Sequence, residues 1–519
     1  YNYSANPKNV APFSKVKFLN RQPFKIIGDF NFYYLPKLIS FRTDIDRGYA
    51  ESLLRNKSSG IVLIEPNYVK TFSWSRLYDF KYDITKALKL EFSATGLARI
   101  DEPPGSIDRD EDDYQWKRDS IWNNIKNMGR MTNYNQSGRI TYNLPINKLP
   151  LMDWLSANAE YATDFRWTAA ALSATELGNS IENSNTKRLN VNGNLVNLYN
   201  KVDFLKEINQ KGKAKTQVRP GTPPPKPKEE SKDSLKTEER INYFKIMTDG
   251  FFRILMSVRN VSLSYSSGNG TFMPGVTYSP RYLGQDWDMM APGTGFIFGS
   301  QDDIRQNAVS GGWITNDNML NTAYSKKFNE NISARSTIEP LPNLKIEVTA
   351  TRNDAWTFSE YFKADSLGIF NSFSPMQKGS YSISFIALNS FFEKQDDKNH
   401  TSSNYNTFKD YLNDISLRLA QQNPNWTGAY NDTTGFPIGY GKTSQEVLIP
   451  AFLAAYTGKS ASSVSLNAFP KIPMPNWRLT YDGLSKIEFF QKYFKSVTLN
   501  HGYKSTYTVS SYQSDTRYK

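Results

Sequence analysis

The sequence contains no cysteine. That absence excludes disulfide frameworks, thiolate metal sites and cysteine nucleophiles, although it does not fix a cellular compartment. Histidine is almost as scarce, because only His400 and His501 are present. A three-histidine zinc site is therefore impossible, and a Ser-His-Asp triad would need one of two histidines that lie outside any recognisable nucleophile motif. We expect a protein that is not an enzyme and that has no catalytic, cofactor-binding or metal-binding residues.

Long hydrophobic runs are also missing. A membrane-spanning helix needs about 20 consecutive apolar residues, and no segment of the sequence supplies them. Hydrophobic residues make up 39% of the chain and the mean hydropathy is −0.58, yet aromatic residues alone account for 14%. A soluble globule can have this composition. So can a transmembrane β-barrel, whose strands are apolar on one face only and whose loops are polar.

The charge balance says little about partners. The formal net charge is +13, but the Lys and Arg residues are scattered and form no long basic run beside aromatic residues, so we expect no nucleic-acid partner. The positive excess is compatible with attraction to anionic lipid headgroups, with a charged lumen, or with a solvated surface of mild positive bias.

Alternation of apolar and polar residues is the dominant pattern, and it predicts strands with one apolar and one polar face. It covers residues 72–82, 88–98, 155–167, 344–350 and 497–503. Similar alternation starts early, around Ile26. The longer runs exceed the roughly 5–6 residues of soluble strands and suit the roughly 9–11 residues of membrane-spanning strands. Tyr161, Phe165 and Trp167 gather toward a strand end, where a barrel carries an aromatic girdle.

We therefore predict an all-β fold: a portion of a very large antiparallel transmembrane β-barrel with long loops and a few short helical inserts. Residues 1–210 are expected to supply barrel strands with extracellular loops. Residues 211–240 are rich in Pro and Lys and poor in apolar residues, which is typical of a flexible linker or loop insertion. Residues 241–519 are expected to supply helix–strand units, a glycine- and aromatic-rich loop region and further barrel strands.

The connections are predicted to be of two kinds. Short proline-containing motifs precede strands at 148–151, 340–343 and 473–476, because proline suits turns and strand starts. Long polar gaps at 99–138 and 352–379 indicate long loops, which would lie at the end opposite the short turns. Residues 241–265 and 484–503 each join a helix-like stretch to a strand, either as helical plugs at the turn end or as ordinary amphipathic helices packed on a sheet.

Two glycine-rich segments are candidate binding sites. Residues 439–443 end like a phosphate-binding loop, but Phe436 occupies the place of its first glycine and Gly435 lies one place too early. No buried strand is expected before it, so we predict an ordinary glycine-rich loop. Residues 275–321 combine glycines with large aromatic residues and have no catalytic spacing. They are predicted to form a compact loop held by rings and permissive backbone turns.

An acidic cluster at residues 108–113 has part of the spacing of a calcium-binding loop. Asp108, Asp110 and Asp112 alternate as the first ligands would, but Asp113 stands where the turn glycine belongs and no Glu follows at the twelfth place. A solvated extracellular loop is favoured over a calcium site. Nothing marks a carboxylate pair for glycoside hydrolysis.

These motifs, together with the repeated Leu/Met-Pro units before strands, resemble the SprA/Sov family. Its members are the giant outer-membrane translocons of the type 9 secretion system in Bacteroidetes. The likeness extends over essentially the whole chain, including the helix-to-strand units. Family members are several times longer, and the sequence shows neither a signal segment nor an apolar or aromatic terminus, so we expect an internal portion of such a protein.

The resemblance implies a wide water-filled pore in the bacterial outer membrane for folded cargo proteins that carry a C-terminal sorting domain. It also implies accessory plug or gating proteins in the outer membrane and periplasm, contact with outer-membrane lipid, and a link to gliding motility. Two rivals remain open. One is a smaller barrel such as a TonB-dependent nutrient transporter, in which a plug domain would precede the strands. The other is a soluble surface adhesin or glycan-binding β protein.

Overall fold

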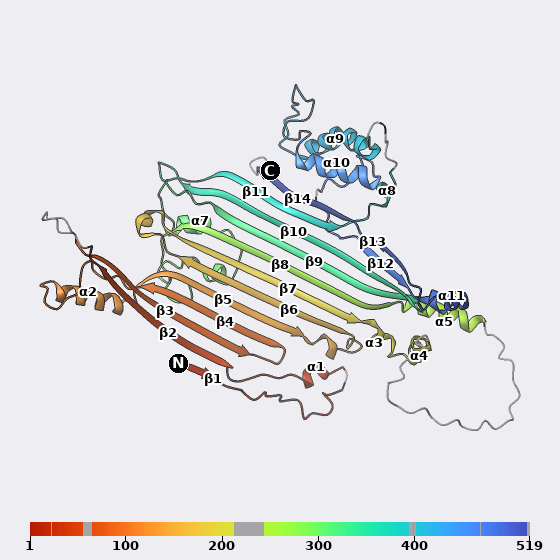
Figure 1. Cartoon of the computed structure of the whole chain (residues 1–519), viewed down its shortest axis with the longest axis horizontal. Coiled ribbons are helices and arrows are strands. Elements are labelled where there is room, and N and C mark those ends of the chain that lie inside the picture. Colours follow the sequence, from red (N-terminus) through yellow and green to blue (C-terminus); the bar gives the residue numbers. More distant parts are fainter. Residues whose placement is uncertain are drawn as a thin grey trace.

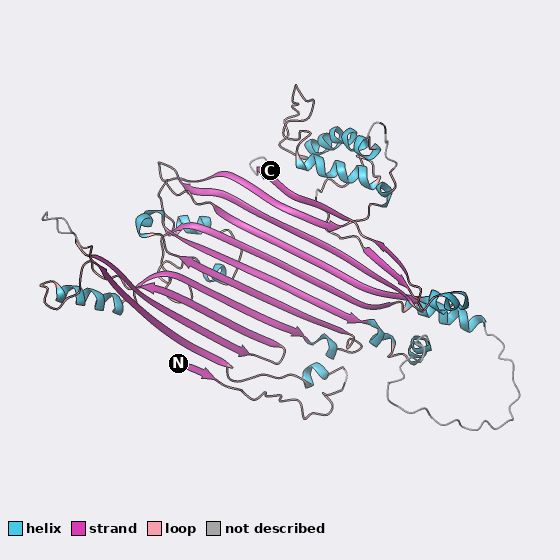
Figure 2. Cartoon of the chain, viewed as in Figure 1, coloured by secondary structure: helices cyan, strands magenta, loops and turns pink. Residues whose placement is uncertain are grey.

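The computed structural model describes residues 1–21, 23–54, 65–211, 243–393, 398, 401–467 and 469–515. Their strands form a single 14-stranded antiparallel sheet, in which most strands pair with their neighbours in sequence (Figures 1 and 2). The strands are β1 (Asn2–Ser4), β2 (Leu38–Ser52), β3 (Asn67–Asp83), β4 (Leu88–Arg99), β5 (Arg130–Leu144), β6 (Leu155–Thr168), β7 (Asn179–Asn194), β8 (Val258–Val276), β9 (Tyr324–Leu341), β10 (Leu344–Ala364), β11 (Phe370–Ser384), β12 (Asn476–Tyr481), β13 (Leu499–Tyr503) and β14 (Thr506–Asp515). The predicted β-rich antiparallel fold is confirmed. Among the described residues the sheet is open, because no pairing joins β1 to β14.

Most of the helical elements are short, and they lie around the sheet rather than within it (Figure 2). They are α1 (Lys25–Gly28), α2 (Tyr114–Lys126), η1 (Pro145–Lys148), η2 (Leu172–Leu177), α3 (Leu195–Tyr199), α4 (Asp203–Lys211), α5 (Tyr243–Leu255), α6 (Thr294–Ile297), α7 (Arg305–Ser310), α8 (Leu388–Phe391), α9 (Ser403–Gln422), α10 (Gln445–Thr457), η3 (Gly483–Lys486) and α11 (Glu488–Tyr493). Within the described parts of the chain, no helix is long and apolar enough to cross a membrane. The predicted linker at 211–240 falls outside the described residues after Lys211.

The strands from β2 to β11 are long, from 12 residues in β4 to 21 in β10. Their register gives the sheet two chemically distinct faces, because residues paired across antiparallel strands point to the same side. We call the side that carries Phe41, Tyr78, Ala94, Phe165 and Phe358 the apolar face, and the opposite side the polar face. Successive strand pairs keep these residues on one side.

One position in the sheet is occupied by an interrupted strand. The C-terminal part of β10 pairs with β11, where Arg352 lies opposite Ile383. Its N-terminal part pairs with β12, where Thr349 lies opposite Asn476. Because β11 and β12 run in the same direction beside β10, β12 continues the line of β11. In the next position, β13 pairs with β12 and β14 with β11. The chain between the two halves of the interrupted strand, residues 385–475, forms what we call the helical insertion.

The helical insertion packs on the apolar face near the β14 edge. The core formed there joins Tyr381 and Ile383 of β11 to Ile415 of α9 and to Val447 and Leu453 of α10. Both helices lie together beside β11 and β14 in Figure 1. Helix α10 consists mostly of apolar residues and ends at Gly458, whose φ of 70° is the left-handed conformation that commonly terminates helices. The insertion therefore covers part of the sheet with a small core of its own.

Glu393 stabilises the start of α9. Its carboxylate accepts hydrogen bonds from the backbone and side-chain nitrogens of Asn404, both at 2.9 Å, and from the hydroxyls of Ser402 and Ser403. The backbone hydrogen bond from Asn404 is the largest cause of a lowered pKa for Glu393, to about 2 from the usual 4.5. Because the pKa is lowered by folding, the stabilisation is complete above about pH 4.5 and is lost as the pH falls from there toward 2.

Glu393→Gln will therefore weaken α9 at neutral pH and flatten its response to acid. Pepsin cleavage within α9, mapped by mass spectrometry at steps between pH 4.5 and 2, should increase with acidity more steeply in the wild type than in the variant. Asp410→Asn, which changes an exposed carboxylate in the same helix, serves as the control and should follow the wild type. Identical acid profiles for the wild type and Glu393→Gln would contradict this role.

Most strand and turn predictions are confirmed. The alternating runs at 72–82, 88–98 and 155–167 lie within β3, β4 and β6. The proline motif at 340–343 directly precedes β10, the motif at 473–476 enters β12, and the motif at 148–151 ends shortly before β6, with residues 152–154 between them. The helix–strand units are also present, since α5 leads into β8 and α11 leads toward β13. Both helices lie at the end of the sheet that carries the two-residue turn between β9 and β10 (Figure 1).

Two predictions about the strands are wrong. The segment 352–379 is not a long polar loop, because it forms most of a hairpin between β10 and β11 with a turn at 365–369. It misleads because Arg352 and Asp354 lie on the apolar face and break the alternation. Regular strand structure also does not start around Ile26, which lies in α1, and the first long strand begins at Leu38.

Loop lengths do not separate cleanly between the two ends of the sheet. At the end with the β9–β10 turn, the connection from β7 to β8 spans residues 195–257. At the opposite end the turn at 365–369 is short, whereas the connections 100–129 and 277–323 are long. The expected contrast of short turns against long loops is therefore only partly correct.

Candidate functional site: the two faces of the sheet

The polar face carries hydroxyl, amide and charged side chains on consecutive strands. Cross-strand contacts tie them together: the hydroxyls of Ser93 and Ser137 lie 2.7 Å apart, and the Nδ2 of Asn158 donates to Oδ1 of Asn143 at 2.7 Å. An ion pair of 2.8 Å also joins Arg188 to Glu160. Because antiparallel neighbours face each other directly, such pairs stabilise the sheet without an apolar cover. The face is suited to contact with water.

A shallow depression of about 630 Å³ crosses β7 to β11 and opens on the polar face. Gly268 and Gly270 form part of its floor, and Thr186, Asn329 and Thr357 contribute polar side chains. None of these side chains forms a nucleophile–base pair. Within the described residues, no group of three or more His, Cys, Asp or Glu side chains could hold a metal ion.

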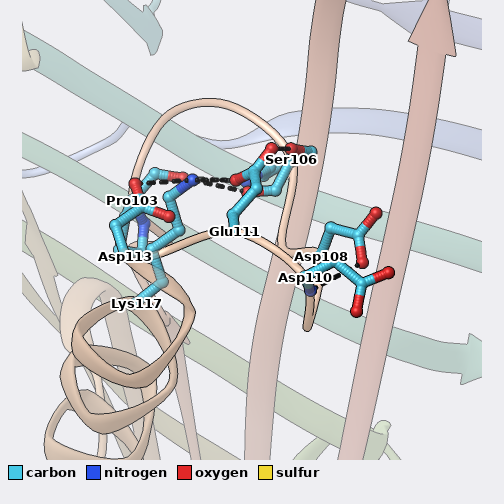
Figure 3. Close-up of polar contacts among 8 residues, drawn as sticks. Pro103, Ser106, Asp108, Asp110, Glu111, Asp113 and Lys117 are labelled. Carbon is cyan, nitrogen blue, oxygen red and sulfur yellow. Dashed lines mark hydrogen bonds and ion pairs between the residues drawn. The ribbon is translucent and has the colours of Figure 1, made fainter.

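The acidic loop at 108–113 directs two of its carboxylates to a lysine (Figure 3). The Nζ of Lys117 lies 2.9 Å from Oε2 of Glu111 and 2.9 Å from Oδ2 of Asp113. Its side chain is only 7% exposed, and the hydrogen bond that it donates to Glu111 is the main cause of a raised pKa for Lys117. The pKa of Glu111 is lowered, first by the hydroxyl of Ser106 and then by Lys117. Lys117 thus neutralises Glu111 and Asp113, whereas Asp108 and Asp110 lie apart from it (Figure 3).

The remaining candidates from the sequence are dispersed. His501 lies on β13, exposed and opposite Leu479, while His400 falls outside the described residues. Residues 439–443 lead into α10 after an isolated bridge between Tyr430 and Pro437, not after a strand. Among the described residues, His501 and the segment 439–443 lie on different elements, β13 and the loop before α10.

The apolar face is partly covered by residues 277–323, which we call the covering segment. Its buried side chains include Phe296, Ile297 and Trp313, which pack with Phe165 and Trp167 of β6. The segment includes α6 and α7 and has glycines with positive φ at 284, 293, 299 and 312. The predicted compact glycine- and aromatic-rich loop is confirmed.

Buried amides on the apolar face bind the backbone of the covering segment. The Nδ2 of Asn183 donates to the carbonyls of Phe296 (2.8 Å) and Ser300 (2.7 Å), and the Nδ2 of Asn185 donates to that of Gly299 (2.5 Å). Asn183 is fully buried and Asn185 is 5% exposed. Unpaired polar groups at such positions would be costly, so these asparagines explain how an irregular loop lies on an apolar sheet.

Aromatic residues at the upper end of β6 do not form the expected girdle. Phe165 and Trp167 are 1% and 2% exposed, because the covering segment lies over them. The indole nitrogen of Trp167 donates to the carbonyl of Tyr278 at 3.0 Å. Tyr161 likewise donates its hydroxyl to the carbonyl of Phe298 at 2.7 Å. These three aromatic residues anchor the chain's own loop.

Two groups of charged side chains also lie on the apolar face, one beside Tyr381 of β11 and one beside the covering segment. Arg352 is 11% exposed and binds Glu330 at 2.7 Å and Asp354 at 3.1 Å. Further along β10, Arg305 of α7 pairs with Glu360, whose side chain is 5% exposed. The charges in these two groups therefore have opposite partners, as buried ions require.

Away from these covers, large apolar side chains on the apolar face remain exposed. Examples are Ile45 on β2, Ile140 on β5, and Val261 and Leu263 on β8, which are between 38% and 58% exposed. Exposed apolar side chains on this face suit contact with another apolar partner or with a membrane. Its position opposite the polar face completes the geometry of the site.

No model of a known protein family matches this chain. Comparison with curated protein sequences finds no match either.

Sequence reasoning missed the polar residues that serve the covering segment. Asn183, Asn185 and Thr271 interrupt the apolar side of β7 and β8 and were indistinguishable from an ordinary weak alternation. Only their position in the strands could have revealed them. All three lie on the side of β7 and β8 that carries apolar residues elsewhere in the same strands. A polar residue that is out of phase with a strand's pattern indicates a buried partner.

Proposed function

We propose that this chain forms a section of the wall of a large outer-membrane β-barrel whose water-filled lumen conducts folded proteins, as in type 9 secretion. Strand length supports the barrel. The strands from β2 to β11 have 12–21 residues, whereas crossing the hydrocarbon core takes roughly 9–11. Sequential up-and-down pairing is the topology of such barrels.

The observation that carries the proposal is the separation of the two faces over consecutive long strands. Serine, threonine, asparagine and charged residues on one face suit a wetted lumen, and exposed Ile, Val, Leu and Tyr residues on the other suit lipid. On β8, for example, Val261 and Leu263 alternate with Ser262 and Ser264. Wide barrels leave an aqueous channel between their walls.

Transport in this proposal needs no covalent chemistry. Folded cargo proteins with C-terminal sorting domains would pass along the polar face. Accessory outer-membrane and periplasmic proteins would gate the passage, and outer-membrane lipid would contact the apolar face. These partners follow from the resemblance to the SprA/Sov family. The polar face supports them by offering a hydrated surface.

Single cysteines on β8 of the otherwise cysteine-free chain test the membrane orientation. Val261 and Leu263 are exposed in this structure, and a surrounding membrane would shield them from a charged reagent. In intact outer membranes, a charged maleimide should label Ser262→Cys and Ser264→Cys but not Val261→Cys or Leu263→Cys. Equal labelling at all four positions would contradict the barrel and favour a soluble surface protein.

Depletion of the full-length protein tests the transport role. Proteins in the medium, on the cell surface and in the periplasm should be quantified before and after depletion. Accumulation of many folded, sorting-domain proteins in the periplasm is the expected result. Normal secretion combined with loss of uptake of one nutrient would point instead to a transporter.

A further inference from the structure

Two tight turns of the covering segment expose a group of apolar side chains. The first is closed by a bridge between Tyr282 and Gln285, and the second by a bridge between Asp286 and Ala291. The exposed side chains are Tyr282 (72%), Leu283 (48%), Trp287 (46%), Met289 (50%) and Met290 (59%). By contrast, Phe296, Ile297 and Trp313 of the same segment are buried.

The backbone holds these side chains outward in a defined conformation. Leu283 and Met290 have φ values of 53° and 52°, which non-glycine residues rarely adopt. The Oδ1 of Asp286 fixes the second turn by accepting from the backbone nitrogens of Asp288 and Met289, at 2.9 and 3.1 Å. Such strained residues are maintained only where the surrounding structure determines them.

The base of the two turns is buried against the sheet. Gln285 is 1% exposed and Ala291 is fully buried. A Cβ on Gly284 would lie 2.6 Å from Cε1 of Phe165 and 3.1 Å from Cε1 of Tyr134, so the first turn lies directly on these rings. The turns therefore stand over the ends of β5 and β6, where the strands of a barrel would present an aromatic girdle to the membrane interface.

We propose that the turns 282–285 and 286–291 form a membrane-interface anchor that enters the boundary between lipid headgroups and acyl chains. The inference rests on the proposed barrel. Because Phe165 and Tyr134 are covered, Tyr282 and Trp287 take the outward place of the girdle, and Leu283, Met289 and Met290 contact acyl chains. Tyrosine and tryptophan are the residues that membrane interfaces favour.

Charge at the turns fits a lipid occupant. Arg281 and Asp288 form an ion pair of 2.9 Å with side chains that are 61% and 71% exposed. Exposed charged groups beside an apolar tip can remain at headgroup level while the tip is inserted. The exposed apolar band on β5 and β8 lies on the same face of the sheet, so the turns extend a surface that the barrel already assigns to lipid.

Nitroxide labels on single cysteines would test this anchor in the full-length protein. The labels are placed at Tyr282→Cys and Met289→Cys, both exposed positions, with Leu263→Cys as the lipid reference and Ser264→Cys as the water reference. The protein is reconstituted in vesicles of phosphatidylethanolamine and phosphatidylglycerol. Accessibility to molecular oxygen, which concentrates in acyl chains, is then compared with accessibility to a water-soluble nickel complex.

The expected result is an oxygen-to-nickel accessibility ratio at residue 289 several-fold higher than at residue 264 and close to that at residue 263, with an intermediate ratio at residue 282. A ratio at 289 that matches 264, while 263 remains lipid-like, would overturn the anchor and leave the barrel intact. Low access to both reagents at 289 would also overturn it, because the turns would then be buried against a protein partner. Water access at both 263 and 289 would reject the barrel and the anchor together.

Discussion

Alanine in place of Gly284 will detach the covering segment from the sheet. Gly284 has a φ of 75°, and a Cβ there would lie 2.6 Å from the ring of Phe165. A left-handed residue costs about 1–2 kcal/mol, and overpacking adds about 1–3 kcal/mol, so we expect the docked state to lose about 2–5 kcal/mol. Hydrogen exchange of residues 277–323 in the membrane-embedded protein should rise accordingly.

Gly312→Ala is the matched control for this effect. Gly312 lies in the same segment with a φ of 66°, but a Cβ there would meet nothing within 4 Å. It should therefore cost only the backbone strain of about 1–2 kcal/mol. If the two alanine variants showed equal exchange, close contact with Phe165 would not be what restricts residue 284.

Removing the guanidinium of Arg352 will destabilise the sheet strongly. In Arg352→Met, the carboxylates of Glu330 and Asp354, each 16% exposed, would lose the cation that both bind. Breaking a buried ion pair by removing one partner typically costs about 3–5 kcal/mol. The free energy of unfolding of the reconstituted protein, measured with urea, should fall by about 3–5 kcal/mol.

Two further variants separate the charge from the packing of Arg352. Arg335→Met removes an arginine from the polar face, where its side chain is 62% exposed and 3.7 Å from Glu347. It should change stability by less than about 1 kcal/mol. Combining Arg352→Met with Glu330→Gln and Asp354→Asn should recover much of the loss, because no unpaired charge remains. Failure of this rescue would mean that Arg352 acts mainly through packing. One such contact is with the ring of Tyr381, whose centroid lies 5.8 Å from the Cζ of Arg352.

Strand identity was predictable because period-two alternation follows directly from strand geometry. The runs in β4 and β6 carry it almost without exception, and their length indicated strands longer than those of ordinary soluble domains. The compact loop at 275–321 was predictable for a related reason. Glycines allow tight backbone turns and large aromatic side chains bury much apolar surface, so the two together in one short stretch predict a compact loop.

Partners contributed from distant segments could not be predicted. Arg352 and Asp354 looked like loop residues, because Glu330 becomes their neighbour only through the pairing of β9 with β10. Phe165 and Trp167 looked like a girdle, because nothing in β6 indicates that residues 277–323 will cover them. Glu111 and Asp113 looked like part of a solvated acidic loop, because Lys117 faces them only after α2 forms.

The interrupted strand beside β10 bears on how the chain tolerates changes in length. Ile383 and Asn476 pair with Arg352 and Thr349, so they are separated by about 10 Å along the strand, at roughly 3.4 Å per residue. Ser384 and a single added residue would span that distance with every side chain still on its proper face. Residues 385–475 are thus a modular addition. They could be lost, shortened or exchanged for another domain while the hydrogen-bond register of the neighbouring strands stays the same.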